Sequence, residues 1–388
     1  RYFLFFWIYK LWHCISKNHF ASICAALTFI LVVRVDEFLY RTFSHQEFVL
    51  PFIFAGFYYF FKERFFLASF LFGLGANIHG IYSLFPMLFI LTYLLLDIKK
   101  WKFKTLIKSG LIFTLSALPF VIFIVQNRLS REQSIVPNNE VDWLQLFITA
   151  CPQNFLFPQA PTIPFEKLKE NWNVLYVLSQ SYISIILLFF VNLFINEPFR
   201  KDKKILSISL MAFFLLVIWG FFTYVHPNRF ILDLNLGRNM QYLTFFLTGY
   251  VVLFLAQQME KQPILAGLLL GILFTFFKFA YVVFNYSLVI IFFIVLILNE
   301  TKNERTWLRS IFITIYVAFI MLAGWQISQT FSHTEMRFNL WINLSVTFAL
   351  LMLNYFFLRF NTQASSRMWQ RKLFLIIPLL VYTVQYTV

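Results

Sequence analysis

Residues 196–224 read NEPFRKDKKILSISLMAFFLLVIWGFFTY, a basic segment followed by twenty residues that carry no charge. An α-helix rises 1.5 Å per residue, so about twenty apolar residues cross the hydrocarbon core of a bilayer. The stretch therefore predicts a membrane-spanning helix over 205–224 whose first turn lies beside a cluster of lysine and arginine.

The same pattern recurs along the whole chain: apolar runs alternate with short polar connections. The runs are about 15–22 residues long, which is near the length that spans a bilayer. None of the runs alternates apolar and polar residues over about ten positions, as strands of a membrane β-barrel do. We predict an all-α, polytopic transmembrane helix bundle with about thirteen membrane helices. The expected spans follow a partial segment over 1–13 and lie near 20–35, 47–61, 65–79, 83–98, 108–126, 174–195, 205–224, 240–258, 263–279, 285–299, 308–327, 340–358 and 372–387.

The composition excludes a water-soluble domain. Hydrophobic residues make up 60% of the chain and charged residues 13%, and the mean hydropathy is +0.73. Soluble proteins carry about 25% charged residues. Even a large soluble domain leaves about a quarter of its unfolded surface in water, and this chain has too few polar residues to cover such a surface.

Positive charge alternates between successive connections. One set of alternate connections holds 21 of the lysines and arginines with seven acidic residues, and the other holds nine with ten. The positive-inside rule places the first set in the cytoplasm. It comprises 10–19, 62–64, 99–107, 196–204, 259–262, 300–307 and 359–371, together with the flanking residues Asp97, Lys108, Arg309 and Lys372. A net charge of +15 is also compatible with nucleic-acid binding. The segregation of the charges between apolar runs favours membrane lipid as the partner and no nucleic acid.

Three parts are expected along the chain: N-terminal helices over 1–126, an external loop over 127–173, and C-terminal helices over 174–388. Within the loop, VDWLQLFI and FEKLKENWNVLYVL are typical of short amphipathic helices on a membrane surface. Cys14, Cys24 and Cys151 lack metal-ligand spacing, and we predict no metal site from them. The chain contains no Walker A, HExxH or GxSxG motif, which leaves a nucleotide-driven pump or a metalloprotease of that type unsupported.

Ionisable residues gather at the predicted outer ends of the helices, where they are candidates for function. The first cluster, RVDEFLYRTFSHQEF, contains Asp36, Glu37, His45 and Glu47. Its carboxylates could act as a base or bind a divalent cation through hard oxygen ligands. The alternative is a solvated loop in which the charges pair with one another.

The second cluster, GANIHGIYSLFP, places His79 in a tight turn between two apolar runs. A histidine there could reach a phosphate or a sugar hydroxyl, or it could simply be a polar residue at the membrane interface.

The third cluster, YVHPNRFILDLNLGRNMQY, contains His226, Arg229, Arg238 and Asn239. Arginine offers a bidentate fork suited to phosphate. Arg238 and Asn239 stand at a predicted helix N-terminus, where free N–H groups favour an anion. The alternative is headgroup snorkelling together with an Arg229–Asp233 ion pair.

Residues 45–96 combine a polar outer start (HQEFVLPFIFAGFYYFF), a basic turn with a small-residue-rich helix (KERFFLASFLFGLGANIH) and a following helix (GIYSLFPMLFILTYLLL). This stretch resembles the third to fifth membrane helices of the glycosyltransferase C superfamily. The preceding WIYKLWHCISKNHFASICAALTFIL resembles the second helix and its basic turn, and LGRNMQYLTFF adds a further match. The resemblance covers about the first hundred residues.

That resemblance implies a polytopic enzyme that transfers a hexosyl group from a polyprenyl-phosphate donor on the outer membrane face. It also places the family's first helix, and the outer loop that bears the catalytic acid, upstream of Arg1, so an N-terminally truncated chain is expected. The catalytic residue is then unassigned, with Asp36, Glu37 and Glu47 as candidates only. The substrate-binding residues that we infer are Arg238, Arg229, His226, Asn239, His79 and His45. A divalent cation stays open as a cofactor.

Two other functions fit the same pattern. A surface-polysaccharide polymerase or ligase would share the outer arginines and the long outer loop. A lipid or solute transporter would place charged or broken helices at the bilayer midplane, whereas here the polar residues gather at the helix ends. For each function we expect a multi-pass protein of a bacterial inner membrane, with the loop 127–173 external.

Overall fold

The computed structural model describes residues 2–32, 45–131 and 185–258, the last range with gaps at 187, 191, 194–195, 227, 229–230 and 232–233. Every regular element within these ranges is a helix, and no strand occurs among them. The predicted all-α class is therefore confirmed for the described part of the chain.

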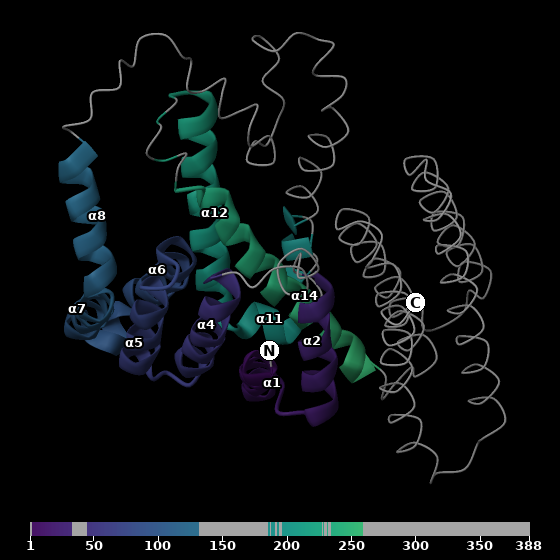
Figure 1. Cartoon of the computed structure of the whole chain (residues 1–388). Coiled ribbons are helices and arrows are strands. Elements are labelled where there is room, and N and C mark those ends of the chain that lie inside the picture. The colour runs from purple at the N-terminus through teal and green to yellow at the C-terminus, as the bar shows by residue number, and fades with distance from the viewer. Residues whose placement is uncertain are drawn as a thin grey trace, which may run out of the picture. The chain divides into compact units, whose positions relative to one another are not determined.

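The helices follow the predicted apolar runs closely (Figure 1). They are α1 (Tyr2–Ser16), α2 (His19–Val32), α4 (His45–Phe61), α5 (Phe65–Ala76), α6 (Gly80–Leu96), α7 (Ile98–Ser116), α8 (Leu118–Arg131), α11 (Glu197–Lys201), α12 (Lys203–Tyr224), the 3₁₀ helix η2 (Leu236–Asn239) and α14 (Met240–Gln258). The partial segment expected over 1–13 thus extends to Ser16, and the run expected to end at residue 79 stops at Ala76.

The bounds of the span predicted over 108–126 differ from those of the helices found there. Helix α7 already begins at Ile98 and α8 continues to Arg131, with a bend of 68° between them. Residues 99–107 are therefore helical except at Lys102, where the helix is kinked, because lysine and leucine are good helix formers. The first residues of the loop expected over 127–173 belong to α8. The bend has a local cause: Pro119 has no N–H to continue the helix and restricts Leu118 before it.

Two described helices are long and apolar enough to cross a membrane, Lys203–Thr223 and Leu236–Gln257. The bent pair Ile98–Ser116 and Leu118–Gln126 makes a third if it forms one span. Helix α5 has 12 residues, which is about 18 Å of helix and less than the hydrocarbon core. These helices support the predicted class of integral membrane protein, while the number of thirteen spans stays a prediction.

The chain divides into two compact units, one formed by 1–185 and 197–249 and the other by 186–196 and 250–388. The core of the first unit is aromatic. Phe57 of α4 is fully buried and packs against Phe72 of α5, Phe89 of α6 and Phe246 of α14, with ring centroids 5.5, 6.5 and 5.1 Å away. Such rings bury large apolar areas and prefer edge-to-face contact, so Phe57 joins four helices of the bundle.

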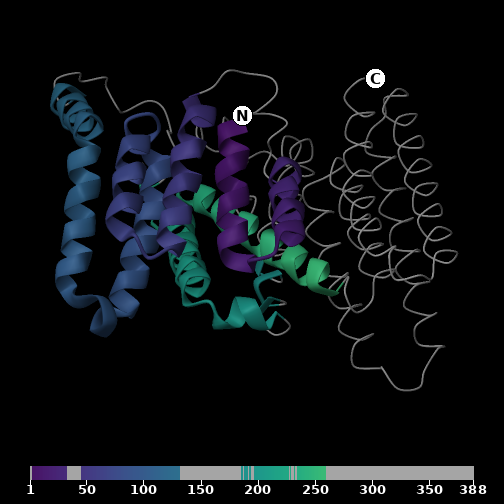
Figure 2. The same cartoon turned by 90° about the horizontal axis from the view of Figure 1, so that it is seen from below.

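Three basic connections of the first unit meet at one end of its helices (Figure 2). Glu63 accepts ion pairs from Lys100 and Lys204, both at 3.3 Å, and Asp97 pairs with Lys203 at 3.7 Å. We call this end, formed by 62–64, 97–100 and 201–204, the basic end. These three connections, which the charge pattern assigns to one side of the membrane, therefore lie together at one end of the described helices of this unit.

The opposite end of the unit contains the turn 77–79, the bend 116–118 and residues 236–241. Asn77 holds it together: its Nδ2 donates to Ser116 O at 2.8 Å and its Oδ1 accepts from Phe120 N at 3.2 Å. We call this the polar end.

In the second unit, Asn196 Nδ2 donates to Tyr250 O at 2.9 Å and to Asn192 Oδ1 at 3.2 Å, so two buried amides link its described segments.

Candidate functional site

The turn between α5 and α6 positions His79 at the polar end. Its backbone is extended, and its Nδ1 accepts a hydrogen bond from Tyr82 N at 3.5 Å, which caps the first turn of α6. Capping satisfies a backbone N–H that has no partner within the helix. The cap fixes the orientation of the imidazole, and the half-buried side chain is accessible from the polar end.

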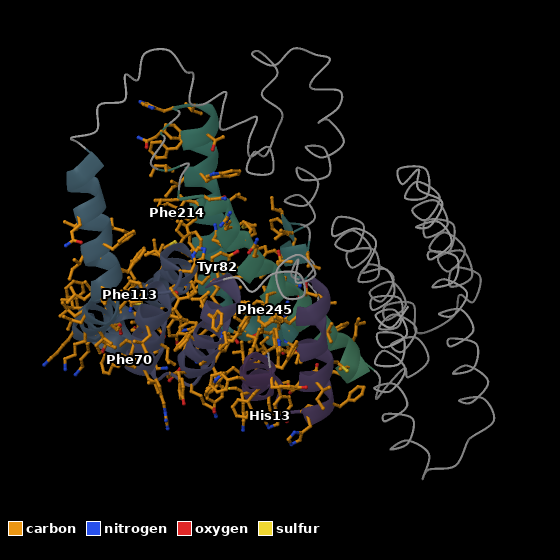
Figure 3. The ribbon with its side chains drawn as sticks, in the orientation of Figure 1. His13, Phe70, Tyr82, Phe113, Phe214 and Phe245 are labelled. Atoms are coloured by element: carbon orange, nitrogen blue, oxygen red, sulfur yellow. The ribbon has the colours of Figure 1, made fainter. Side chains whose placement is uncertain are left out.

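Tyr82, labelled in Figure 3, is the residue on which two distant stretches of sequence converge through hydrogen bonds. Its side chain is only 8% exposed, and its hydroxyl donates to Gln241 Oε1 at 3.4 Å. Tyr242 Oη donates to Tyr82 O at 2.7 Å. The ring of His79 meets the Tyr82 ring edge-on, with centroids 4.5 Å apart.

Arg238 completes this arrangement, because it lies close enough to the Tyr82 hydroxyl for an electrostatic interaction. We call His79, Tyr82, Arg238, Gln241 and Tyr242 the Tyr82 cluster. Helix η2 presents Arg238 after a sharp turn at Asn235, whose φ of 45° is in the left-handed region that asparagine tolerates. Arg238 and Gln241 are half-buried, so their polar atoms are partly desolvated and yet reachable by a ligand.

Asn239 follows Arg238 and is completely buried. Its Nδ2 donates to Leu236 O, while its Oδ1 has no hydrogen-bond partner among the described residues. A buried amide oxygen without a partner is costly. Asn239 therefore lies in the turn that presents Arg238, and its Oδ1 could still accept a hydrogen bond.

The structure brings together only some of the residues predicted to bind substrate. His79 and Arg238 meet at the Tyr82 cluster, and Asn239 adjoins Arg238 in sequence. His226 is exposed beyond the end of α12, and its side chain makes no hydrogen bond or ion pair to a described residue. Arg229, Asp36 and Glu37 lie outside the described residues, and of His45 and Glu47 only the backbone, in the first turn of α4, is described.

Among side chains that the structure describes, all carboxylates belong to the basic end or its neighbourhood: Glu63, Asp97, Glu197 and Asp202. No group of three or more potential metal-ligating side chains occurs within those residues. The described part of the polar end is thus cationic and rich in hydroxyl and amide groups. Such a site suits an anion that also carries hydroxyl groups.

No family model, curated protein or solved structure matches the chain in the three comparisons. The chemistry of the Tyr82 cluster and the geometry of the helices are therefore the basis for inferring a function.

Sequence reasoning missed Tyr82 and Tyr242. Tyr82 stands in the second cluster and Tyr242 at the end of the third, but neither was assigned a role. The available signal was the spacing of Tyr82, three residues after His79, which puts the two side chains on one face of a helix start. No pattern in the sequence pointed from Tyr82 to Gln241, because those residues are 159 positions apart.

Proposed function

We propose that this protein is a membrane glycosyltransferase that moves a hexosyl group from a polyprenyl-phosphate donor to an acceptor hydroxyl. The observation that supports the proposal is the convergence of Arg238, His79 and Tyr82 at the polar end, opposite the basic end. The positive-inside rule then puts the basic end in the cytoplasm and the Tyr82 cluster on the outer face.

Four members of the Tyr82 cluster have a role in this proposal. The Arg238 guanidinium offers two parallel N–H donors to the donor phosphate, and His79, on the Tyr82 ring, is a second contact to that phosphate. Gln241 and the Tyr82 hydroxyl, already in contact with one another, offer hydrogen bonds to the hydroxyls of the sugar. The apolar helices α6 and α14 line the path that the polyprenyl chain would follow in the bilayer.

The transfer itself is a substitution at the anomeric carbon. The acceptor oxygen forms a bond to that carbon while the bond to the phosphate oxygen breaks, and the polyprenyl phosphate leaves with the electron pair. Arg238 stabilises the negative charge that grows on the leaving phosphate, an effect worth most in a partly desolvated site. A carboxylate accepts the proton of the acceptor, and Asp36, Glu37 and Glu47 are the candidates within this sequence.

The test is a transfer assay on membranes that contain the full chain, supplied with radiolabelled polyprenyl-phosphate hexoses. We expect Arg238→Ala to lower the transfer rate by about tenfold or more, since a charge-assisted hydrogen bond contributes about 1.5–3 kcal/mol. Arg238→Lys keeps the charge but lacks the two parallel N–H donors. Its transfer rate should therefore lie between that of the unaltered chain and that of Arg238→Ala. Arg64→Ala is the matched control, because Arg64 is an exposed arginine at the basic end.

Label that reaches an acceptor, and is lost in Arg238→Ala alone, supports both the activity and the site. Transfer that Arg238→Ala leaves unchanged overturns the phosphate-binding role. No transfer from any of the donors by the unaltered chain overturns the activity.

A further inference from the structure

The first eleven residues of α7, IKKWKFKTLIK over 98–108, contain five lysines and no acidic residue. Lys100 pairs with Glu63 at 3.3 Å. The other four lysines are exposed, and none of them has an ion-pair partner among the described residues. We call these four, Lys99, Lys102, Lys104 and Lys108, the lysine patch. Four uncompensated charges on three turns of helix repel one another and favour an anionic partner.

The start of the segment is fixed to the helix bundle. The Trp101 ring packs edge-on against Phe65 of α5, with centroids 4.7 Å apart, and Lys100 Nζ lies 4.3 Å from the centre of the Trp101 ring. Lys102 then takes a φ of 60°, which interrupts the helix and redirects the residues that follow. The lysine patch is thus presented from an anchored position at the basic end rather than from a free tail.

An exposed apolar strip follows the lysine patch along α7. Phe103, Ile107, Leu111 and Leu115 recur every four residues, which puts them on one side of the helix, and Leu115 at the far end is 67% exposed. Lys104 and Lys108 stand at the beginning of this strip. The order from charged to apolar along the helix matches the order from headgroup to acyl chain through one leaflet of a bilayer.

We propose that the lysine patch binds the phosphate groups of anionic phospholipids in the membrane leaflet that faces the basic end. Lysines beside a membrane segment attract anionic lipid over about one Debye length, and their long apolar stems let the ammonium groups reach the headgroups. An acidic protein or a nucleic acid would match the charge but would leave the apolar strip in water. The proposal requires a membrane but does not depend on sugar transfer, and it concerns the end of the unit opposite the Tyr82 cluster.

The test uses the full chain in a neutral detergent, titrated with a fluorescent phosphatidylglycerol and, separately, with the equivalent phosphatidylcholine. The variant replaces all four lysines of the patch by glutamine. We expect it to bind phosphatidylglycerol about tenfold more weakly or worse, from the contribution of several surface lysines. The corresponding four-arginine variant keeps the charge and should bind within about threefold of the unaltered chain.

A second four-site variant controls for position. It replaces Lys10, Lys17, Lys62 and Arg200 by glutamine, which removes the same charge from residues outside α7. This control should bind phosphatidylglycerol within about threefold of the unaltered chain, because screening by salt limits the effect of each charge to about one Debye length. If the patch variant does not fold, the unaltered chain in 0.5 M salt serves instead, and its phosphatidylglycerol binding should fall by a similar factor.

Four results would overturn the proposal. Equal binding of the two lipids by the unaltered chain would remove the role of the anionic headgroup. A positional control as weak as the patch variant would mean a diffuse charge effect. Displacement of the lipid by 10 mM inorganic phosphate would identify a free-anion site instead. Retained lipid binding by the patch variant, with loss of binding to a polyanion such as heparin, would assign the lysines to another class of partner.

Discussion

At the scale of single residues, Tyr82 shows how a site forms from stretches that are unrelated in sequence. Its hydroxyl reaches Gln241 while its carbonyl accepts from Tyr242, 160 positions away. The two bonds differ in length, 3.4 and 2.7 Å. The short bond from Tyr242 is structural, whereas the long bond to Gln241 is weak enough for both groups to turn to a ligand.

Tyr82→Phe separates these roles, because it removes the hydroxyl and keeps the ring and the backbone carbonyl. We expect the thermal midpoint to change by less than about 2 °C and the transfer rate to fall about 3- to 10-fold, the value of a neutral hydrogen bond. Tyr93→Phe, on the same helix near the basic end, should leave transfer unchanged. A Tyr82→Phe variant with full activity would remove the hydroxyl from the site.

Glu63 is the residue that holds the basic end together. Burial by itself would raise the pKa of its carboxyl, but Lys204 and Lys100 outweigh that effect and lower the pKa below its ordinary value. The folded protein therefore binds a proton at Glu63 less readily than the unfolded chain does. The resulting stability is present above the ordinary pKa near 4.5 and is lost as the pH falls through the lower folded value.

Glu63→Gln should accordingly lower the thermal midpoint at pH 7, and the difference from the unaltered chain should shrink below about pH 4. The carboxylate is 37% exposed, so solvent screening keeps the loss under about 1 kcal/mol. Melting curves in detergent at several pH values measure it. The control is Glu197→Gln, which breaks a fully exposed pair with Lys201 and should have no measurable effect. A loss independent of pH would contradict the ion-pair explanation.

At the scale of helices, close approach between α5 and α7 depends on Gly73. A methyl group at this position would lie 1.9 Å from Ser116 Oγ and 2.6 Å from the backbone oxygen of Phe113. The serine side chain can rotate away, but the carbonyl oxygen cannot move without shifting the helix. Small residues are the usual means by which membrane helices come this close.

Gly73→Ala should therefore destabilise the protein by about 1–3 kcal/mol, the range for overpacking. Gly110 on α7 is the matched control, because a methyl group there meets no atom within 4 Å. Gly110→Ala should be neutral or stabilising by up to about 1 kcal/mol, since alanine favours the helix. Denaturation curves of the two variants compare them directly, and an equal loss in both would reject the close-contact explanation.

At the scale of the whole molecule, the proposed orientation predicts which residues each side of the membrane can reach. Single cysteines would replace Lys62 or Arg200 at the basic end and Asn228 beyond the end of α12, all exposed, in a chain whose native cysteines are serine. A membrane-impermeant maleimide should label Asn228→Cys in intact cells, and Lys62→Cys and Arg200→Cys only after the membrane is opened. The reverse pattern would invert the topology.

The position of the helices was predictable from the sequence, and their ends were less so. The apolar run at 205–224 became α12, beginning two residues earlier, because Asp202 caps it through Lys204 N and Ile205 N. The run at 108–126 was predicted as one span. The lysines before it carry enough helix propensity to extend it, and Pro119 bends it.

The candidate site was predictable in its members but not in its assembly. His79 and Arg238 stood out because charged and polar groups are rare and costly at the edge of a membrane. Nothing local in the sequence indicated that both residues interact with Tyr82, or that the His226 side chain makes no hydrogen bond or ion pair to a described residue.

The sequence by itself determined the class of protein, the sites of most helices and the segregation of basic connections, because hydropathy and charge act on each segment separately. Only the tertiary structure decided which helix ends meet. Packing around Phe57, the close contact at Gly73 and the bonds from Asn77 align α5, α6, α7 and α14. That alignment depends on side-chain shapes from distant parts of the chain, which must interdigitate at crystal-like density.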